Sequence, residues 1–367
     1  MAEYEIWLTN DTGARLARLQ PFWFQATRVV NDVGTCQLGM APDFDTAFLK
    51  RDYMIQFWRA PSGGRPGMFR TYFLRQWRWD LIGEVETLRL YGRDMNDLLA
   101  RRVVAYDEDS DEANTSTNES DDAIKLIVTE NLITDTSGPT YGSRDYANLS
   151  VTPDVAAGPV IAKHYSRRRV LDVLQEFAES ADTAGTRLYF DIAESGVSTA
   201  TLALQFRTYV TQPGMDLTDL GVVFEPARGN FVNCWLDYDY TDEENYICGL
   251  GQGEGGDRIL QESYDTAAIT ASAWNRREGI VNATGEDTAA GVLDQADSAL
   301  RARRGIVSCG GDLRDTEGFR FGRDWNWGDV LRARYREREF DGLVSAISLS
   351  VDSDGRETVT GRLEDVG

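Results

Sequence analysis

Few side chains in this sequence could carry catalysis. His164 is the only histidine, so a zinc site built on two or three histidines is excluded. It lies among four cations, Lys163, Arg167, Arg168 and Arg169, which disfavour a further positive charge on its ring. The sequence also lacks the Gly-x-Ser-x-Gly elbow of serine hydrolases. We therefore expect no catalytic residues and no enzyme activity.

The cysteines give no sign of a metal site or a disulfide framework. Cys36, Cys234, Cys248 and Cys309 are widely spaced and include no Cys-x-x-Cys pair. Four reduced thiols are the ordinary state of a protein that folds in a cytoplasm. We expect no bound metal and no other cofactor.

A glycine-rich run at 249–256 contains the spacing Gly-x-Gly-x-x-Gly at Gly251, Gly253 and Gly256. A dinucleotide site needs this spacing between a strand and a helix whose N-terminus holds the pyrophosphate. Residues 257–264 read as another strand, and Glu254 would repel a phosphate. We expect a tight connection between two strands here rather than a nucleotide site.

Carboxylates are abundant, with 60 Asp and Glu, so a pair suited to sugar hydrolysis cannot be recognised from their number alone. Asp107, Asp109 and Asp111 resemble the start of a calcium loop, but its sixth position is Glu112 and its twelfth is Asn118. An EF-hand requires glycine and glutamate there. The acidic run at 106–122 is expected to be a solvated loop, with weak calcium binding as the alternative.

Three groups of residues are candidates for binding surfaces, each with a plainer alternative. Lys163, Arg167, Arg168 and Arg169 form either a solvated patch or a contact for an acidic neighbour, such as another copy of the chain. Trp77 and Trp79 point to one face of a strand, which favours a packed core over a sugar-stacking platform. The turn at 325–328, with Trp325 and Trp327, is an interface anchor or a local corner of the core.

The elements that must position these residues are mostly strands. Tyr4, Ile6 and Leu8 alternate with polar residues, and further strands are expected at 22–30, 53–58, 69–80 and 84–91, with the short regular spacing of a barrel or sandwich. Apolar stripes predict helices at 94–104, from Ser120 onward, at 167–183 and at 287–304, the last with Thr284 and Asp287 as a capping box. Strands are expected again at 187–192, 199–210, 222–225, 233–240, 246–250, 258–264, 306–309, 330–335, 343–351 and 357–363.

This order of elements predicts a β-rich α+β chain of several domains. We expect an N-terminal β-rich domain at 1–105, an α+β domain at 106–221 that carries the acidic loop, and a C-terminal β-rich domain at 222–367. The chain has 367 residues and a net charge of −22. That charge argues against wrapping nucleic acid or docking on an anionic membrane. No apolar run is long enough for a membrane-spanning helix, and no secretory signal opens the sequence.

Four stretches in this order resemble one family. They are LRLYGRD at 88–94, GLGQGEGGDR at 249–258, RREGIVNA at 276–283 and FGRDWNWGDV at 321–330. Together they resemble the siphovirus Gp37-like tail proteins, relatives of the hub proteins of phage baseplates. Two positions depart from the pattern, Asn282 where an acidic residue is expected and Trp327 where an aliphatic one is expected.

The resemblance implies a structural function at the distal end of a phage tail tube, in the virion, after assembly in the host cytoplasm. It implies a multi-domain phage hub fold with two β-barrel-like tube domains and α+β peripheral domains. The chain would form a homotrimer that adapts the sixfold tube to a threefold tip and gates DNA, which passes through the lumen without specific binding. Implied partners are the distal tail protein, the tail tube protein, the tape measure protein and tail fibre or receptor-binding proteins.

Two other functions stay open at this point. A carbohydrate-binding or carbohydrate-degrading tail-tip protein is suggested by Trp77, Trp79, Trp325 and Trp327 together with the surplus carboxylates. An unrelated cytoplasmic enzyme has only the glycine-rich run in its favour.

Overall fold

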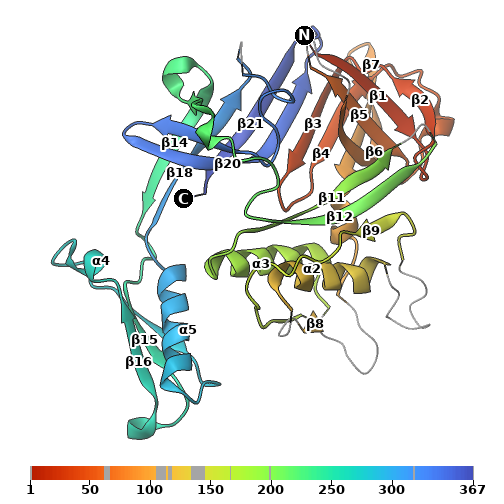
Figure 1. Ribbon diagram of the computed structural model, residues 1–367. Coiled ribbons are helices and arrows are strands. Elements are labelled where there is room, and N and C mark those ends of the chain that lie inside the picture. The colour runs from red at the N-terminus through yellow and green to blue at the C-terminus, as the bar shows by residue number, and fades with distance from the viewer. Residues whose placement is uncertain are drawn as a thin grey trace. The chain divides into compact units, whose positions relative to one another are not determined.

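The computed structural model describes residues 2–61, 67–104, 113–114, 118–133, 145–165, 167–197, 200–316 and 319–366. The chain divides into two compact units, each described by itself (Figure 1). Unit 1 contains residues 1–182, 186–234 and 310–367, and unit 2 contains residues 235–309 with the short piece 183–185. Most of the expected acidic loop at 106–122 lies outside the described residues, at 106–112 and 115–117. The expected three-part domain division stays a prediction.

The N-terminal part of unit 1 is a run of antiparallel strands. Buried and more exposed side chains alternate along these strands, as expected for a sheet with one buried face. Phe24, Ala26 and Leu38 are buried, whereas Gln25 and Gln37 face the solvent side. The strands are β1 (Glu3–Thr9), β2 (Arg15–Leu19), β3 (Trp23–Val29), β4 (Thr35–Met40), β5 (Met54–Ala60), β6 (Gly67–Ile82) and β7 (Val85–Asp94). The strands expected in this region are therefore confirmed, with shifted ends.

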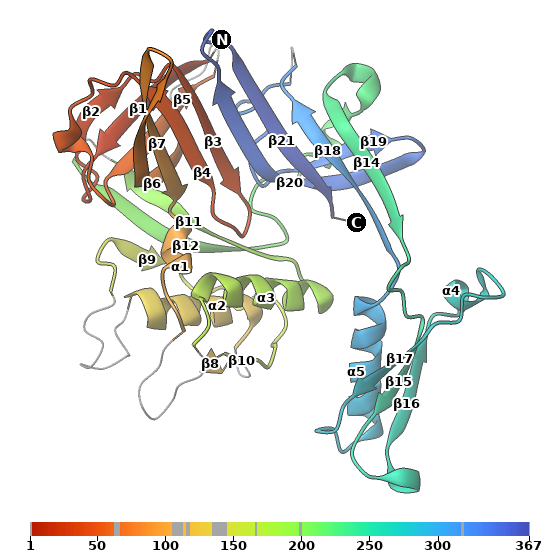
Figure 2. The same ribbon diagram turned by 180° about the vertical axis from the view of Figure 1, so that it is seen from behind.

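The C-terminal strands of unit 1 join the same sheet. They are β13 (Val223–Phe224), β14 (Phe231–Asp239), β18 (Ile306–Arg314), β19 (Val330–Tyr335), β20 (Arg338–Val351) and β21 (Glu357–Asp365). The ends of β14 and β18, residues 235–239 and 306–309, belong to unit 2. β20 pairs with β3, from Ala346 opposite Val29 to Val351 opposite Phe24, so one sheet runs through both β-rich parts (Figure 2). The order is β14-β18-β21-β20-β3-β4-β7-β6-β5-β1-β2, with β19 and β13 branching from β20. Within the described residues this path is open and forms no closed barrel.

A smaller α+β part of unit 1 packs around a core that also includes Met54 and Phe73 of the main sheet. Its sheet has the order β11 (Leu188–Val197), β12 (Leu202–Val210) and β9 (Leu149–Val151), and the two-residue strands β8 (Ala113–Asn114) and β10 (His164–Tyr165) pair beside it. The helices α2 (Ser120–Val128) and α3 (Val170–Thr183) turn Ile124, Ile127, Leu174 and Phe177 onto this sheet, where all four are buried. Both helices were expected from their apolar stripes, and the β-rich α+β class is confirmed.

The helix expected at 94–104 is much shorter. Only α1 (Asp97–Ala100) is helical, because Asp94 belongs to β7 and Val103 pairs with Arg169 in an isolated bridge. Met95, Leu98 and Leu99 are buried, which explains the apolar stripe without a long helix. The remaining short turns are η1 (Thr46–Phe48), η2 (Thr129–Ile133), η3 (Thr218–Leu220), η4 (Pro226–Arg228) and η5 (Gly255–Asp257).

Unit 2 is a three-stranded sheet with one long helix. The order is β16 (Leu260–Tyr264), β15 (Tyr246–Leu250) and β17 (Glu278–Asn282), with α5 (Ala289–Ala302) packed on one face and α4 (Thr266–Thr270) in the connection between β16 and β17. Val292 and Ala296 of α5 are fully buried against β15. The expected helix at 287–304 is confirmed, but its cap is Thr288, whose side chain accepts a hydrogen bond from the Gly291 N–H, so the box at Thr284 was wrong.

Candidate assembly site

The glycine-rich run connects two antiparallel strands. Gly251 closely follows β15, Gly253 has a φ of +105° and Gly255 begins the short turn η5, after which β16 starts. The next element is the strand β16 rather than an α-helix, so the peptide N–H groups that would hold a pyrophosphate are not arranged here. Across the described parts of the chain, no group of His, Cys, Asp and Glu is placed to hold a metal ion.

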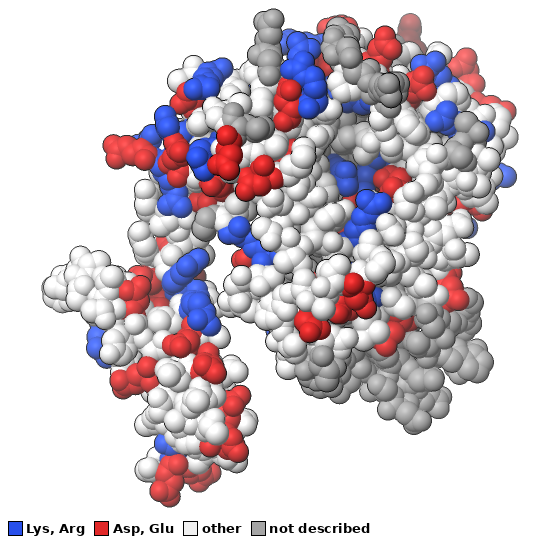
Figure 3. Space-filling model, viewed as in Figure 1, with Lys and Arg blue, Asp and Glu red and all other residues white. Residues whose placement is uncertain are grey.

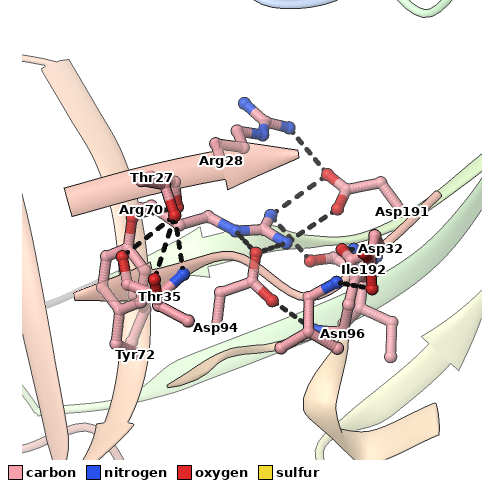
Figure 4. A network of polar contacts seen from close by, with 12 residues as sticks. Thr27, Arg28, Asp32, Thr35, Arg70, Tyr72, Asp94, Asn96, Asp191 and Ile192 are labelled. Atoms are coloured by element: carbon pink, nitrogen blue, oxygen red, sulfur yellow. Dashed lines mark hydrogen bonds and ion pairs between the residues drawn. The ribbon is translucent and has the colours of Figure 1, made fainter. Parts of the chain in front are cut away.

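A buried polar junction joins the main sheet to the smaller sheet of unit 1 (Figure 4). Arg70 on β6 is fully buried and donates to Asp94 on β7, with Nε at 3.0 Å from Oδ2. Its Nη2 lies 2.7 Å from Oδ1 of Asp191 on β11, and its Nη1 donates to the carbonyl of Ile192 at 3.0 Å. One guanidinium therefore connects three strands of two sheets.

Two more residues complete this junction. Arg28 on β3 lies 2.7 Å from the other carboxylate oxygen of Asp191. The side chain of Asn96 accepts a bond from the Ile192 N–H at 2.7 Å, and its backbone N–H donates to Asp94 at 3.1 Å. A buried charge is costly unless it is paired and hydrogen-bonded, and here both conditions are met.

The two carboxylates of the junction respond differently to their surroundings. Burial raises the pKa of Asp94 to about 7, although Arg70 acts in the opposite direction. Burial acts to raise the pKa of Asp191 as well, but Arg70 and Arg28 outweigh it and the pKa of Asp191 is lowered. Asp191 is therefore the fixed negative charge of the junction, and Asp94 is the group that titrates nearest neutral pH.

A second polar cluster joins the first strand to the last hairpin of unit 1. Arg59 donates to Glu357 at 2.9 Å and to the carbonyl of Phe321 at 2.9 Å, and Tyr4 donates to the same carboxylate of Glu357. Asp315 lies 3.8 Å from Arg59. Burial and the neighbouring Glu357 raise the pKa of Tyr4, so its hydroxyl stays protonated. The N-terminal and C-terminal β-rich parts are thus connected by polar contacts as well as by the sheet.

The tryptophans of the 325–328 turn are core residues of the chain. Trp325 is fully buried, with its ring 5.2 Å from that of Phe321 and 6.5 Å from that of Phe224. Trp327 is 8% exposed and lies under the guanidinium of Arg28 at 3.8 Å. The turn therefore packs as a corner of the core beside the junction, and its part in contacts between chains stays a prediction.

The basic cluster, which consists of Lys163, Arg167, Arg168 and Arg169, lies just before α3. Arg167, Arg168 and Arg169 are exposed, and Arg167 has a φ of +50°. Arg168 and Lys163 both contact Glu176 of α3, at 2.5 and 3.4 Å. The hydrogen bond from Arg168 is the main cause that lowers the pKa of Glu176. Glu176 offsets part of this positive charge, and the exposed arginines keep the patch basic.

Trp77 and Trp79 lie on the outer half of β6, beyond the packed core. Trp79 is 38% exposed, and Leu81 and Ile82 after it are each 69% exposed. The expected core face was therefore wrong here, because β6 extends past the layer that buries Phe73 and Leu74.

The junction residues were missed in the sequence. A signal was present, because Arg70 interrupts the otherwise apolar or neutral run FRTYFL at 69–74. A charged residue in such a run is a candidate for a buried ion pair. Its partner Asp191 interrupts the apolar run LYFDIA at 188–193 in the same way, whereas Asp94 has no such signal, and nothing in the sequence pairs the three residues.

Comparisons with known proteins agree on one kind of protein. A tail protein from Neisseria meningitidis MC58 is 13% identical with a TM-score of 0.56, and the match covers 99% of this chain and 97% of that one. The 43 kDa tail protein of prophage MuSo2 from Shewanella oneidensis is 14% identical with a TM-score of 0.58, covering 98% and 97%. Prophage tail protein gp18 from Listeria monocytogenes EGD-e is 9% identical with a TM-score of 0.52, covering 98% and 94%. These likenesses show a shared fold.

The family comparison confirms the resemblance found in the sequence. None of the curated proteins matches the chain. The model of the family described as siphovirus ReqiPepy6 Gp37-like protein matches residues 5–363. Since this match spans nearly the whole sequence, the chain belongs to the siphovirus ReqiPepy6 Gp37-like protein family.

Proposed function

We propose that this chain is a structural, non-enzymatic protein of the baseplate hub at the distal end of a phage tail tube, where it forms a homotrimeric ring. Family membership and the fold shared with phage tail proteins support a tail component. The observation that carries the ring is the β3–β20 pairing, which joins two β-rich parts in one sheet. Three such chains contain six β-rich parts, two from each chain. A threefold ring of this kind can therefore present six similar surfaces to a sixfold tube.

In this proposal the two β-rich parts are the barrel-like tube domains, and the rest of the chain forms peripheral domains. The division at 1–105, 106–221 and 222–367 is kept as the proposed domain organisation. The partners would be the distal tail, tail tube and tape measure proteins, with tail fibres or receptor-binding proteins outside. The ring would adapt the tube to the tip and gate the passage of DNA.

The net charge of −22 supports a channel that DNA crosses without binding. Carboxylates repel phosphates and leave no site at which the DNA would stop. We expect acidic residues to outnumber basic ones on the lumen wall of the assembled ring. A structure of the ring with a basic lumen would contradict this part of the proposal.

Two measurements test the ring and its place. Light scattering of the purified chain at high concentration should give three times the mass of one chain, whereas a strict monomer would count against a self-assembling ring. Antibody labelling of assembled tails should mark the distal tip, and labelling elsewhere would refute the assignment. Replacing Arg167→Glu and Arg168→Glu together should weaken self-association if the basic cluster contacts an acidic copy, and Arg51→Glu, an exposed arginine in a turn, is the matched control.

A carbohydrate-binding function at the tail tip is the second candidate, because Trp79 is partly exposed on a protruding hairpin. Exposed aromatic rings stack on sugars with their apolar faces. Glycan-array binding that is lost with Trp79→Ala would support it. Equal binding by the variant, or no binding by the wild type, would refute a sugar site at this residue.

A further inference from the structure

Unit 2 buries little apolar surface for its size. Its buried apolar side chains are Ile247, Ala283, Val292, Ala296 and Cys309. Large apolar or aromatic side chains of the same unit are exposed, from Trp235 at 39% to Trp274 at 92%. Burying one large apolar side chain stabilises a fold by about 1.5–3 kcal/mol, so natural domains turn most of them inward. Exposure of this extent marks a surface that another molecule covers.

The two faces of the unit 2 sheet differ. α5 covers the face that carries Ile247 and Ser263. The opposite face, here called the open face, consists of three cross-strand rows: Tyr264–Tyr246–Glu278, Glu262–Cys248–Ile280 and Leu260–Leu250–Asn282. Leu260, Tyr264 and Ile280 on the outer strands are 53%, 56% and 60% exposed. Six of these nine side chains are apolar, aromatic or cysteine. The open face therefore has the composition of a buried sheet face, although its outer strands are exposed.

The aromatic end of the open face is held in place within the unit. The rings of Tyr246 and Tyr264 stack at 5.9 Å with an angle of 13° between their planes. Arg276 lies 4.1 Å above Tyr246 and donates to Glu278 at 2.6 Å. A platform fixed before binding loses less conformational entropy when a partner docks.

The charge of unit 2 restricts the chemistry of a partner. Residues 235–309 contain more than twice as many Asp and Glu as Arg, and no Lys. Figure 3 shows these carboxylates spread over unit 2, while the surface at α4 is uncharged. Of the two carboxylates within the open face, Glu278 pairs with Arg276, so Glu262 carries the negative charge of this face that faces a partner. A partner with Lys or Arg beside an apolar centre is therefore complementary.

The size of the open face fits a single helix. Three strands about 4.8 Å apart, each five residues long, span roughly 15 Å in each direction. One α-helix with its side chains is about 10–12 Å wide. The long helices of this chain are poor candidates, because α3 exposes Asp172, Glu179 and Asp182, which would face the acidic open face.

We propose that the open face of unit 2 binds an amphipathic helix of a different tail protein. Its apolar stripe covers Leu250, Leu260 and Ile280, and a Lys or Arg side chain pairs with Glu262. The helix would add a third layer to a two-layer unit, as helices do on both faces of most buried sheets. This inference rests on the proposed function, because the partner belongs to the tail.

The test is site-specific photo-crosslinking in purified phage tails. The photoreactive residue p-benzoylphenylalanine replaces Ile280 in the full chain, and a control chain carries it at Asp294, an exposed position on α5. The crosslinked peptides are identified by mass spectrometry. A third chain combines the Ile280 probe with Glu262→Arg, which reverses the charge at the centre of the face and leaves the apolar side chains and the Arg276–Glu278 pair in place.

The expected result is a crosslink from position 280, absent from position 294, to a helical segment of another tail protein that has Lys or Arg beside its apolar stripe. Charge reversal should reduce its yield at least tenfold. A crosslink to another copy of this chain, to an acidic segment, or in equal amount from both positions would overturn the inference. If the chain is present in tails but position 280 does not crosslink, only this inference fails. If the chain is absent from tails, the proposed function fails and this inference with it.

Discussion

Arg70 should contribute far more to stability than any exposed ion pair of the chain. Arg70→Met keeps the length of the side chain but leaves Asp94 and Asp191 without the guanidinium between them, and only Arg28 still contacts Asp191. Arg70 and the two carboxylates that it contacts, Asp94 and Asp191, are fully buried. Removing one partner of such a pair costs about 3–5 kcal/mol, because an uncompensated charge remains.

The control is Arg75→Met on the same strand. Arg75 contacts Asp52 at 2.6 Å, but both side chains are well exposed, at 39% and 44%. An exposed pair of this kind contributes about 0–1 kcal/mol. Urea unfolding followed by tryptophan fluorescence compares the two variants with the wild type. A loss of less than about 1 kcal/mol for Arg70→Met would refute the reasoning, since it would mean that the carboxylates are not desolvated.

The pH dependence of Arg70→Met gives a second check. Burial has already raised the pKa of Asp94 to about 7 with Arg70 present, and removal of this cation raises the pKa further. A carboxyl group with a higher pKa in the folded than in the unfolded chain stabilises the fold at a pH below its unfolded pKa, which is about 3.9 for Asp. This stabilisation is lost as the pH rises through the pKa of the folded chain. The stability lost on Arg70→Met should therefore be smaller at pH 5 than at pH 8. A larger loss at pH 5 would contradict the assignment of Asp94 as the titrating group.

The other predictions concern single packing or titration effects. In the wild type the contribution of Asp94 to stability should fall as the pH rises from about 4 to about 7, and Asp94→Asn should flatten that part of the pH profile, as urea midpoints would show; an unchanged profile would exclude Asp94 as its source. Trp325→Ala should lower the free energy of unfolding of unit 1 by about 3–5 kcal/mol, and Trp325→Phe by less, in thermal unfolding. Gly251→Val should destabilise unit 2 by about 1–3 kcal/mol in hydrogen exchange, because the new side chain would overlap Val292, and equal protection would refute that close contact. Thr288→Ala should cost about 1 kcal/mol, since the N-terminal cap of α5 is lost, whereas Thr288→Ser should keep it.

The sequence allowed the fold class, most strands and three of the helices to be predicted, because these depend on local periodicity. α5 is an example, since Val292 and Ala296 recur at helical spacing and both are buried. The N-terminal cap of α5 was predicted at the wrong threonine, because Thr284 and Thr288 are both residue types that cap helices. The backbone of the folded chain places Thr288 at the cap position. The short α1 shows the opposite case, in which a helical pattern of buried residues is satisfied by a turn and a bridge.

The junction around Arg70 could not be predicted, because it is built by contacts between distant parts of the chain. Asp191 is more than a hundred residues from Arg70, and although each of the two interrupts an apolar or neutral run, nothing in the sequence pairs them. For the turn at 325–328 the sequence predicted two alternatives, a corner of the core or an interface anchor. The burial of the Trp325 ring shows that this residue packs in the core of its own chain.

The pairing of β3 with β20 also has a consequence for the order in which the protein can fold. Ala26 on β3 pairs with Leu349 on β20, and Tyr4 on β1 contacts Glu357 on β21. The edge of β3 is therefore covered only after the last hairpin has formed. Contacts between residues this far apart slow folding, because a long loop must close before they form. During synthesis at about 5–20 residues per second, β3 is exposed for many seconds before β20 is made. A ribosome-bound chain therefore carries an open strand edge, which makes holding by a chaperone valuable until synthesis is complete.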